Sequence, residues 1–334
     1  MEEHLRGQGC REEFPPLFPR AEILPKEVLF QREIPDGGNE SAKISGFPAR
    51  VELPTARGTV VPIALRIRPC RTALNRSSIS DYTLNCYGGC MHGCVYCYAR
   101  YMERFYPHSE PWGDYVDIKL GILEALRRQL RRLPPGKVFL SSACDGWQPV
   151  EAQFALTRKA AELLLQHGFS LQILTKSDLI LRDLPLFVDR PVKVGVSVSC
   201  VDDRLAELWE PRAAPPSVRF DVVAKAHQMG IKAVVMFAPV LPFLSDSPSQ
   251  VEAVLVKSAE MGASEIWVDS FNLRPKVWES VRRLLREHFP ELERRYRELV
   301  FDEKTYARYR DSLRNRIVAV TRRVGLSELV QLCF

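Results

Sequence analysis

Four cysteines within twelve positions mark the part of the chain best equipped for chemistry. Cys90, Cys94 and Cys97 follow a C-x3-C-x2-C spacing within DYTLNCYGGCMHGCVYCYARY, and Cys86 lies four residues before Cys90. The glycines among them permit the tight turns that a backbone needs to wrap a small metal centre. Three thiolate ligands would leave one position of that centre open for a substrate or a cofactor.

Zinc is the competing occupant of this segment. With Cys86 as a fourth ligand, the site would be closed and structural. Zinc modules usually present two C-x2-C pairs, however, and the chain contains no second pair. A loop rich in glycine and histidine is also poor core material, which argues against cysteines that only pack. We therefore expect a metal centre that involves Cys90, Cys94 and Cys97.

The composition indicates the setting of this centre. The chain has 334 residues, 46% of them hydrophobic and 26% charged, which is typical of a soluble globular protein with a sizeable core. No uninterrupted apolar run approaches about eighteen residues, and the polar N-terminal segment predicts no secretion signal. Nine unevenly clustered cysteines favour metal or thiol chemistry over disulfides. We expect a cytoplasmic protein, because thiols stay reduced in that compartment.

Alternating strands and helices are predicted to position the cysteine segment. Short β-branched or apolar runs typical of buried parallel strands occur at residues 78–87, 137–144, 170–177, 192–200, 232–241 and 264–272. Helical patterns fill residues 114–133, 157–168, 218–230 and 247–262, and the last three end at a glycine suited to a C-cap. This alternation predicts right-handed crossovers and a parallel sheet. Periodicity is compatible with a partial or complete barrel and with a doubly wound sheet.

Three regions follow from these patterns. Residues 1–75 are predicted to be an irregular N-terminal extension with short strands at ARVEL and TVVPIALRI. Residues 76–274 form the α/β unit, and residues 275–334 are predicted to contain helices only. Since ligands bind at the carboxyl ends of parallel strands, the cysteine segment and the ends of the later strands should converge on one mouth.

The cysteine segment resembles the signature of the radical S-adenosylmethionine superfamily, in which an aromatic residue precedes the last cysteine. The fuller string ISDYTLNCYGGCMHGCVYCYARY is similar to the spore photoproduct lyase-like branch, also called DNA repair photolyase-like. The similarity continues through SSACDGWQPVE, ILTKS, VSVS and WEPRAAPP to about residue 275. Many members of that branch carry proline where this chain has Cys86.

The resemblance implies a (β/α)6 partial barrel of the TIM type and a specific chemistry. Cys90, Cys94 and Cys97 would hold three irons of a 4Fe–4S cluster, and the fourth iron would chelate S-adenosylmethionine. Reductive cleavage would give methionine and a 5′-deoxyadenosyl radical that abstracts hydrogen from a C–H bond of the substrate. A protein such as flavodoxin or ferredoxin would donate the electron.

The resemblance also assigns roles to individual residues. Tyr96 would lie near the adenine, and Lys176 would contact the carboxylate of the cofactor. Ser197 or Ser199 would reach the ribose or the carboxylate, with ordinary packing inside the barrel as the alternative. Ser142, Cys144 and Asp145 would line the same mouth. Cys144 and Tyr98 would be the candidates for hydrogen donation, whereas Glu210 and Arg212 could equally form a structural ion pair.

Two other functions stay open at this level. Residues 275–334 contain 14 Lys and Arg against 9 Asp and Glu, within a chain of net charge +6. A nucleic-acid-binding iron–sulfur protein would use this basic region to grip phosphates, but a solvated set of amphipathic helices is favoured. A zinc-binding interaction module is the second alternative. The substrate itself is not specified by any of these patterns.

Overall fold

A curved, mostly parallel sheet forms the centre of the computed structural model, which describes residues 50–54, 60–272 and 275–334. The first 49 residues of the predicted N-terminal extension lie outside the described residues. The strand order is β3-β4-β7-β8-β9-β10-β11-β12, and every neighbouring pair is parallel except β3 with β4. The strands are β3 (Asn75–Arg76), β4 (Tyr82–Leu84), β7 (Lys137–Leu140), β8 (Ser170–Thr175), β9 (Val192–Val198), β10 (Lys232–Val240), β11 (Glu265–Ser270) and β12 (Val330–Leu332).

All six predicted strands are present in the predicted order. Their β-branched residues are buried, as in β9, where Val192, Val194, Val196 and Val198 are all at most 3% exposed. Because alternate residues share a face of a strand, these valines bury one face of β9, and Gly195 is buried on the other. The sheet is open because β3 and β12 are edge strands, so the architecture is an α/β partial barrel.

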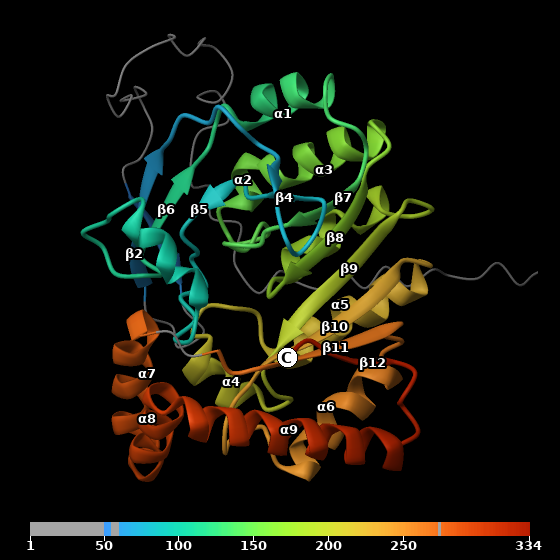
Figure 1. The fold of residues 1–334 in the computed structure, drawn as a ribbon. Helices are drawn as coiled ribbons and strands as arrows, with labels where there is room; N and C mark the ends of the chain where they lie inside the picture. The colour runs from blue at the N-terminus through green and yellow to red at the C-terminus, as the bar shows by residue number, and fades with distance from the viewer. Residues whose placement is uncertain (1–49, 55–59, 273–274) are drawn as a thin grey trace, which may run out of the picture.

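Helices follow the strands and cover the sheet (Figure 1). They are α1 (Ile122–Leu130), α2 (Glu151–Phe154), α3 (Leu156–Gln166), α4 (Asp203–Trp209), α5 (Pro216–Gln228) and α6 (Pro248–Glu260), with short 3-10 turns η2 (Asp178–Arg182) and η3 (Leu184–Leu186). Gly168, Gly230 and Gly262 follow α3, α5 and α6 with φ of 77°, 74° and 82°. These left-handed residues confirm the predicted glycine C-caps.

A small second sheet has the order β1-β2-β6-β5 and corrects one prediction. Its strands are β1 (Arg50–Pro54), β2 (Val60–Ile67), β6 (Tyr115–Ile118) and β5 (Tyr87–Gly88). The predicted β1 and β2 pair antiparallel, but the first part of the expected helix over 114–133 is strand β6. All four residues of β6 are buried between β2 and β5, and a helix begins only after Gly121.

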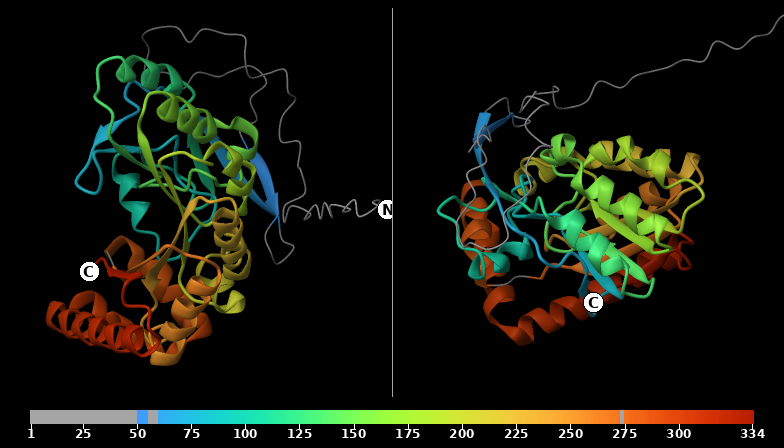
Figure 2. Two further views of the ribbon diagram at one scale, coloured as in Figure 1. Left: turned by 90° about the vertical axis from the view of Figure 1, so that its right-hand side faces the viewer. Right: turned by 90° about the horizontal axis from the view of Figure 1, so that it is seen from above.

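The C-terminal region packs at the end of the molecule opposite α1 (Figures 1 and 2). It contains α7 (Pro275–His288), the 3-10 turn η4 (Pro290–Leu292), α8 (Glu293–Phe301) and α9 (Glu303–Arg323). The prediction of helices only is wrong at the last residues, because β12 extends the large sheet alongside β11. Three residues at a sheet edge are too few for a periodic signal. No helix in the described ranges has the length and apolar character needed to cross a membrane.

Candidate active site

The cysteine loop lies between β5 and the 3-10 helix η1 (Tyr98–Arg104). Two tight turns shape it, since Gly93 N donates to Cys90 O and Cys97 N donates to Cys94 O, each at 3.2 Å. Gly93 has a φ of 63°, a left-handed conformation that disfavours side chains with a Cβ. Cys90 and Cys94 are buried, and Cys97 is half-buried. The loop therefore gathers the three predicted ligands in one compact turn.

Cys86 lies in a different environment from these three thiols. It is 1% exposed and belongs to the main hydrophobic core. Burial and then the nearby Glu151 carboxylate raise the pKa of its thiol well above the usual value. The charges that perturb Cys90, by contrast, are Asp145, Cys94 and Cys97. Cys86 is thus a core thiol, whereas Cys90, Cys94 and Cys97 influence one another.

The segment after β7 holds the cysteine loop in place, beginning with Asp145. Its Oδ1 accepts from Thr175 Oγ1 at 2.7 Å, and its Oδ2 accepts from Lys176 N at 2.7 Å. Oδ2 also lies 3.4 Å from Nδ1 of His92, which stands between Cys90 and Cys94 in the sequence. Burial lowers the pKa of His92 to about 4, although Asp145 opposes this shift. His92 is therefore a neutral group, and its contact with Asp145 joins the cysteine loop to the ends of β7 and β8.

Gln148 provides a second attachment. Its side chain is fully buried, its Oε1 accepts from Met91 N at 2.9 Å, and its Nε2 donates to Gly89 O at 3.3 Å. A single amide thus satisfies one donor and one acceptor of the cysteine loop's backbone. Such buried groups would otherwise cost free energy.

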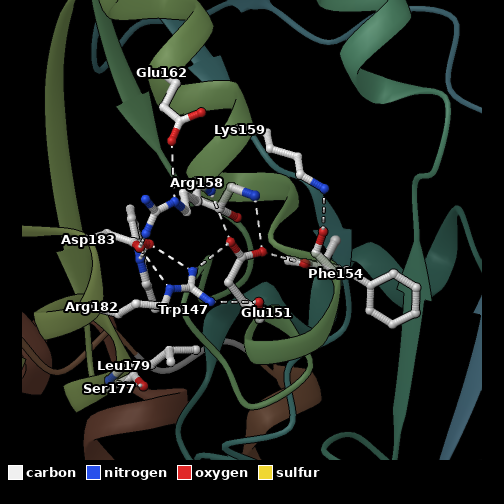
Figure 3. Close-up of polar contacts among 12 residues, drawn as sticks. Trp147, Glu151, Phe154, Arg158, Lys159, Glu162, Ser177, Leu179, Arg182 and Asp183 are labelled. Atoms are coloured by element: carbon white, nitrogen blue, oxygen red, sulfur yellow. Dashed lines mark hydrogen bonds and ion pairs between the residues drawn. The ribbon is translucent and has the colours of Figure 1, made fainter. Parts of the chain in front are cut away.

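Glu151 provides a third attachment and belongs to a buried network drawn in Figure 3. It accepts from Tyr87 Oη, from Thr157 N at 3.0 Å and from Arg158 N at 2.9 Å. Arg158 and Arg182 both contact Asp183, which also accepts from Trp147 Nε1 at 2.9 Å. Paired buried charges of this kind fix the segment after β7.

Both candidates for hydrogen donation lie at this mouth. Cys144 Sγ is 3.7 Å from Asn85 Oδ1, and Asn85 Nδ2 donates to Ser142 Oγ at 3.1 Å. The Tyr98 hydroxyl, on a side chain that is half exposed, donates to the Ser142 carbonyl. Burial raises the pKa of Cys144 to about 12, against the lowering influence of Lys119. Cys144 is therefore a protonated thiol at neutral pH.

Lys176, Tyr96 and Glu210 meet on the other side of the cysteine loop. The Tyr96 hydroxyl donates to Glu210 Oε1, and Lys176 Nζ is 3.9 Å from the same oxygen and 5.8 Å from the Tyr96 ring centroid. Arg219 pairs with Glu210 Oε2 and donates to the Ser197 carbonyl at 2.7 Å. Although burial opposes ionisation, Arg219 and Lys176 lower the pKa of Glu210, which remains a carboxylate.

The structure also places the predicted serines and the suggested ion pair of Arg212. Ser199 is fully buried and its hydroxyl finds no hydrogen-bond partner in the part of the chain that the structure describes, whereas Ser197 is half-buried. The suggested ion pair between Glu210 and Arg212 does not form. Arg212 Nη1 instead donates to Asp114 Oδ1 at 2.8 Å.

The C-terminal helices cover the cysteine loop. Val95 N donates to Trp209 O at 2.9 Å, and Ser280 of α7 donates to Val95 O at 2.8 Å. An apolar cluster surrounds Cys94 and Tyr96 and includes Leu241 and Phe271, from the ends of β10 and β11, with Trp278 of α7. The predicted convergence of strand ends is thus present, under a helical cover.

The loop fits an iron–sulfur cluster by its donors and charges. Thiolates are the ligands that such clusters take. Burial raises the pKa of Cys94 to about 12; Lys176 and Arg219 lower it while Glu210 raises it, so two cations and one carboxylate lie near this ligand. Within the described ranges, no three His, Cys, Asp or Glu side chains are grouped around a single ion position. A cubane cluster takes each cysteine on a different iron, so its ligands need not surround a single ion position.

Sequence reasoning missed Asn85, Gln148 and Arg219. Asn85 and Gln148 act through partners far away in sequence, as Gln148 does with a backbone 57 residues earlier, and Arg219 pairs with a glutamate nine residues earlier. Gln148 lies within the quoted string SSACDGWQPVE, so its position near the mouth could be predicted from the sequence. Its hydrogen bonds to the backbone of the cysteine loop could not.

Comparisons with known proteins agree with the predicted family. The sequence model of the Radical SAM superfamily matches residues 84–251. An uncharacterized protein of Mycobacterium tuberculosis is 33% identical over 275 residues, covering 77% of this chain and 80% of the relative. An uncharacterized protein of Methanocaldococcus jannaschii is 29% identical over 239 residues, covering 71% and 86%.

Solved structures of spore photoproduct lyase share the fold. The enzyme complexed with dinucleoside spore photoproduct aligns with a TM-score of 0.59 at 13% identity, covering 81% of this chain and 82% of that chain. A mutant with bound AdoMet and the same ligand aligns with a TM-score of 0.52 at 12% identity, covering 71% and 80%. Identity this low supports the similarity of fold alone.

Proposed function

The chain belongs to the radical S-adenosylmethionine superfamily, and from this we propose that it cleaves S-adenosylmethionine reductively to initiate hydrogen abstraction from a substrate C–H bond. When bound, the 4Fe–4S cluster supplies the electron for that cleavage. The observation that carries the proposal is the loop of Cys90, Cys94 and Cys97 at one end of the parallel sheet, where Lys176 follows β8 and lies beside the ring of Tyr96.

The roles of the chain's own residues follow from their contacts. Lys176 is largely buried, and its Nζ makes no hydrogen bond within the described part of the chain, so its ammonium can take the carboxylate of the cofactor. Tyr96 presents an aromatic ring beside Lys176, which suits the adenine. Ser199 offers a buried hydroxyl in need of a partner, which suits a ribose or carboxylate oxygen.

Cys144 is the proposed hydrogen donor. A thiol can give a hydrogen atom only while it is protonated, and the raised pKa of Cys144 keeps the S–H bond present at neutral pH. Tyr98 lies beside it through the Ser142 carbonyl. We further propose that a small redox protein such as a flavodoxin or ferredoxin reduces the enzyme. Reversal of thymine photoproducts is not favoured, because the match of SSACDGWQPVE to the lyase donor is inexact.

Anaerobic turnover tests the function. Protein reconstituted with iron and sulfide should convert S-adenosylmethionine to methionine and 5′-deoxyadenosine when dithionite is added. Chromatography with mass detection measures both products. Cys94→Ala is the control that should abolish cleavage, and intact S-adenosylmethionine in wild-type incubations would refute the proposed function.

A further inference from the structure

The carboxylate of Glu210 lies at the centre of a buried polar cluster that the proposed reaction does not use directly. Glu210 follows α4, and its side chain is fully buried. Both oxygens are engaged, Oε1 by the Tyr96 hydroxyl and Oε2 by Arg219. Because the carboxylate is fully buried and already bonded at both oxygens, Glu210 acts through its neighbours.

Two of those neighbours face the proposed cofactor. Tyr96 sits between two predicted cluster ligands, and the bond from its hydroxyl to Glu210 holds the ring against Trp209 and Phe271, whose centroids lie 6.3 and 6.4 Å away. Lys176 Nζ lies 3.9 Å from Glu210 Oε1, which is the outer limit of an ion pair. Glu210 thus fixes a ring firmly and holds an ammonium loosely.

The backbone around Glu210 is joined to the same elements. Val95 N donates to Trp209 O at 2.9 Å, and Ala214 N donates to Lys176 O at 3.0 Å. Arg219 Nε donates to Ala214 O at 2.5 Å, so the partner of the carboxylate is also tied to this segment. The segment therefore connects the cysteine loop to the end of β8 through backbone bonds as well as through the side chain.

We propose that Glu210 is a positioning residue, which orients the Tyr96 ring and retains the Lys176 ammonium so that both meet S-adenosylmethionine. A loosely held ammonium can exchange toward the carboxylate of the cofactor without leaving a strong ion pair. A ring fixed by its hydroxyl needs no ordering when the cofactor binds, which preserves affinity. This inference rests on the proposed function, since it requires that S-adenosylmethionine binds here.

Two variants test the proposal, and neither leaves Glu210 or Arg219 as a buried charge without its partner. Tyr96→Phe keeps the ring and removes only the bond to Glu210. The double variant Glu210→Gln, Arg219→Gln removes both charges together, because Arg219 left alone would be buried and unpaired. Glu293→Gln is the control, since it breaks only the solvent-accessible ion pairs with Arg282 and Arg286 and contacts neither Tyr96 nor Lys176.

The measurements are calorimetric titration of the cluster-loaded proteins with S-adenosylmethionine and the change that the ligand causes in the electron paramagnetic resonance spectrum. Tyr96→Phe should weaken binding about three- to tenfold and the double variant at least about tenfold, at unchanged iron content, whereas the control stays within about twofold. Wild-type affinity and spectra in Tyr96→Phe, or an equal loss in the control, would overturn the positioning role. Wild-type protein that binds no S-adenosylmethionine would overturn the proposed function as well.

Discussion

Replacement of Gln148 by leucine should destabilise the cysteine loop through its backbone, without changing any of the three predicted cluster ligands. The buried amide satisfies Met91 N at 2.9 Å and Gly89 O at 3.3 Å, and leucine of similar size satisfies neither. A buried backbone group left without a partner costs about 1–3 kcal/mol, so two groups should lower the free energy of unfolding by about 2–6 kcal/mol. Because both groups belong to the cysteine loop, iron retention should fall with stability.

The assay combines thermal unfolding of the metal-free protein with iron retention after gel filtration of the reconstituted protein. Gln153→Leu is the matched control, because the buried Oε1 of Gln153 has no hydrogen-bond partner among the described residues. That change should alter the free energy of unfolding by less than about 0.5 kcal/mol. If Gln148→Leu unfolds at the wild-type midpoint and keeps its iron, the clamp has no energetic role and the reasoning fails.

Three further predictions concern the loop, the cofactor and the surface. Gly93→Ala should lower the free energy of unfolding by about 2 kcal/mol or more, since its φ is 63° and a Cβ would lie 2.4 Å from Arg212 Nη2. Gly230→Ala, whose Cβ would lie in open space, should lower it less in the same chemical denaturation, and equal losses would contradict the packing argument. Lys176→Ala should keep the cluster but weaken S-adenosylmethionine binding by about 2 kcal/mol, roughly thirtyfold, and an unchanged affinity in calorimetry would sink the assignment. Duplex DNA should bind only in the micromolar range or more weakly at physiological salt, because cap arginines such as Arg282 pair with nearby carboxylates; nanomolar anisotropy titrations with a steep salt slope would reverse that view.

Local patterns were sufficient for most of the fold. Runs such as VKVGVSV place buried β-branched residues at every second position, which predicts a strand. Glycines such as Gly168 end helices for a backbone reason that holds in any context. β6 was mistaken for a helix because its four residues precede a strongly amphipathic segment. Its strand conformation depends on β2 and β5, which lie far away in the sequence.

The candidate site was predictable to the level of its ligand types. The spacing of three cysteines is local, so the sequence carries it directly. The pairing of Glu210 with Arg219 and Tyr96, rather than with Arg212, depends on where α4 and α5 place their side chains. Such choices are made by tertiary packing, which no pattern within one segment records.

The most direct measurement of the central claim is the iron content of cysteine variants after anaerobic reconstitution. Wild-type protein should hold about four irons per chain with the brown absorption of a 4Fe–4S cluster. Cys86→Ala should retain both, because Cys86 lies in the core beside Glu151 and Thr157, whereas Cys94→Ala should lose both. Loss of iron from Cys86→Ala, or stoichiometric zinc in place of iron in the wild type, would contradict the assignment of Cys90, Cys94 and Cys97 as the ligands of a cluster with one open iron.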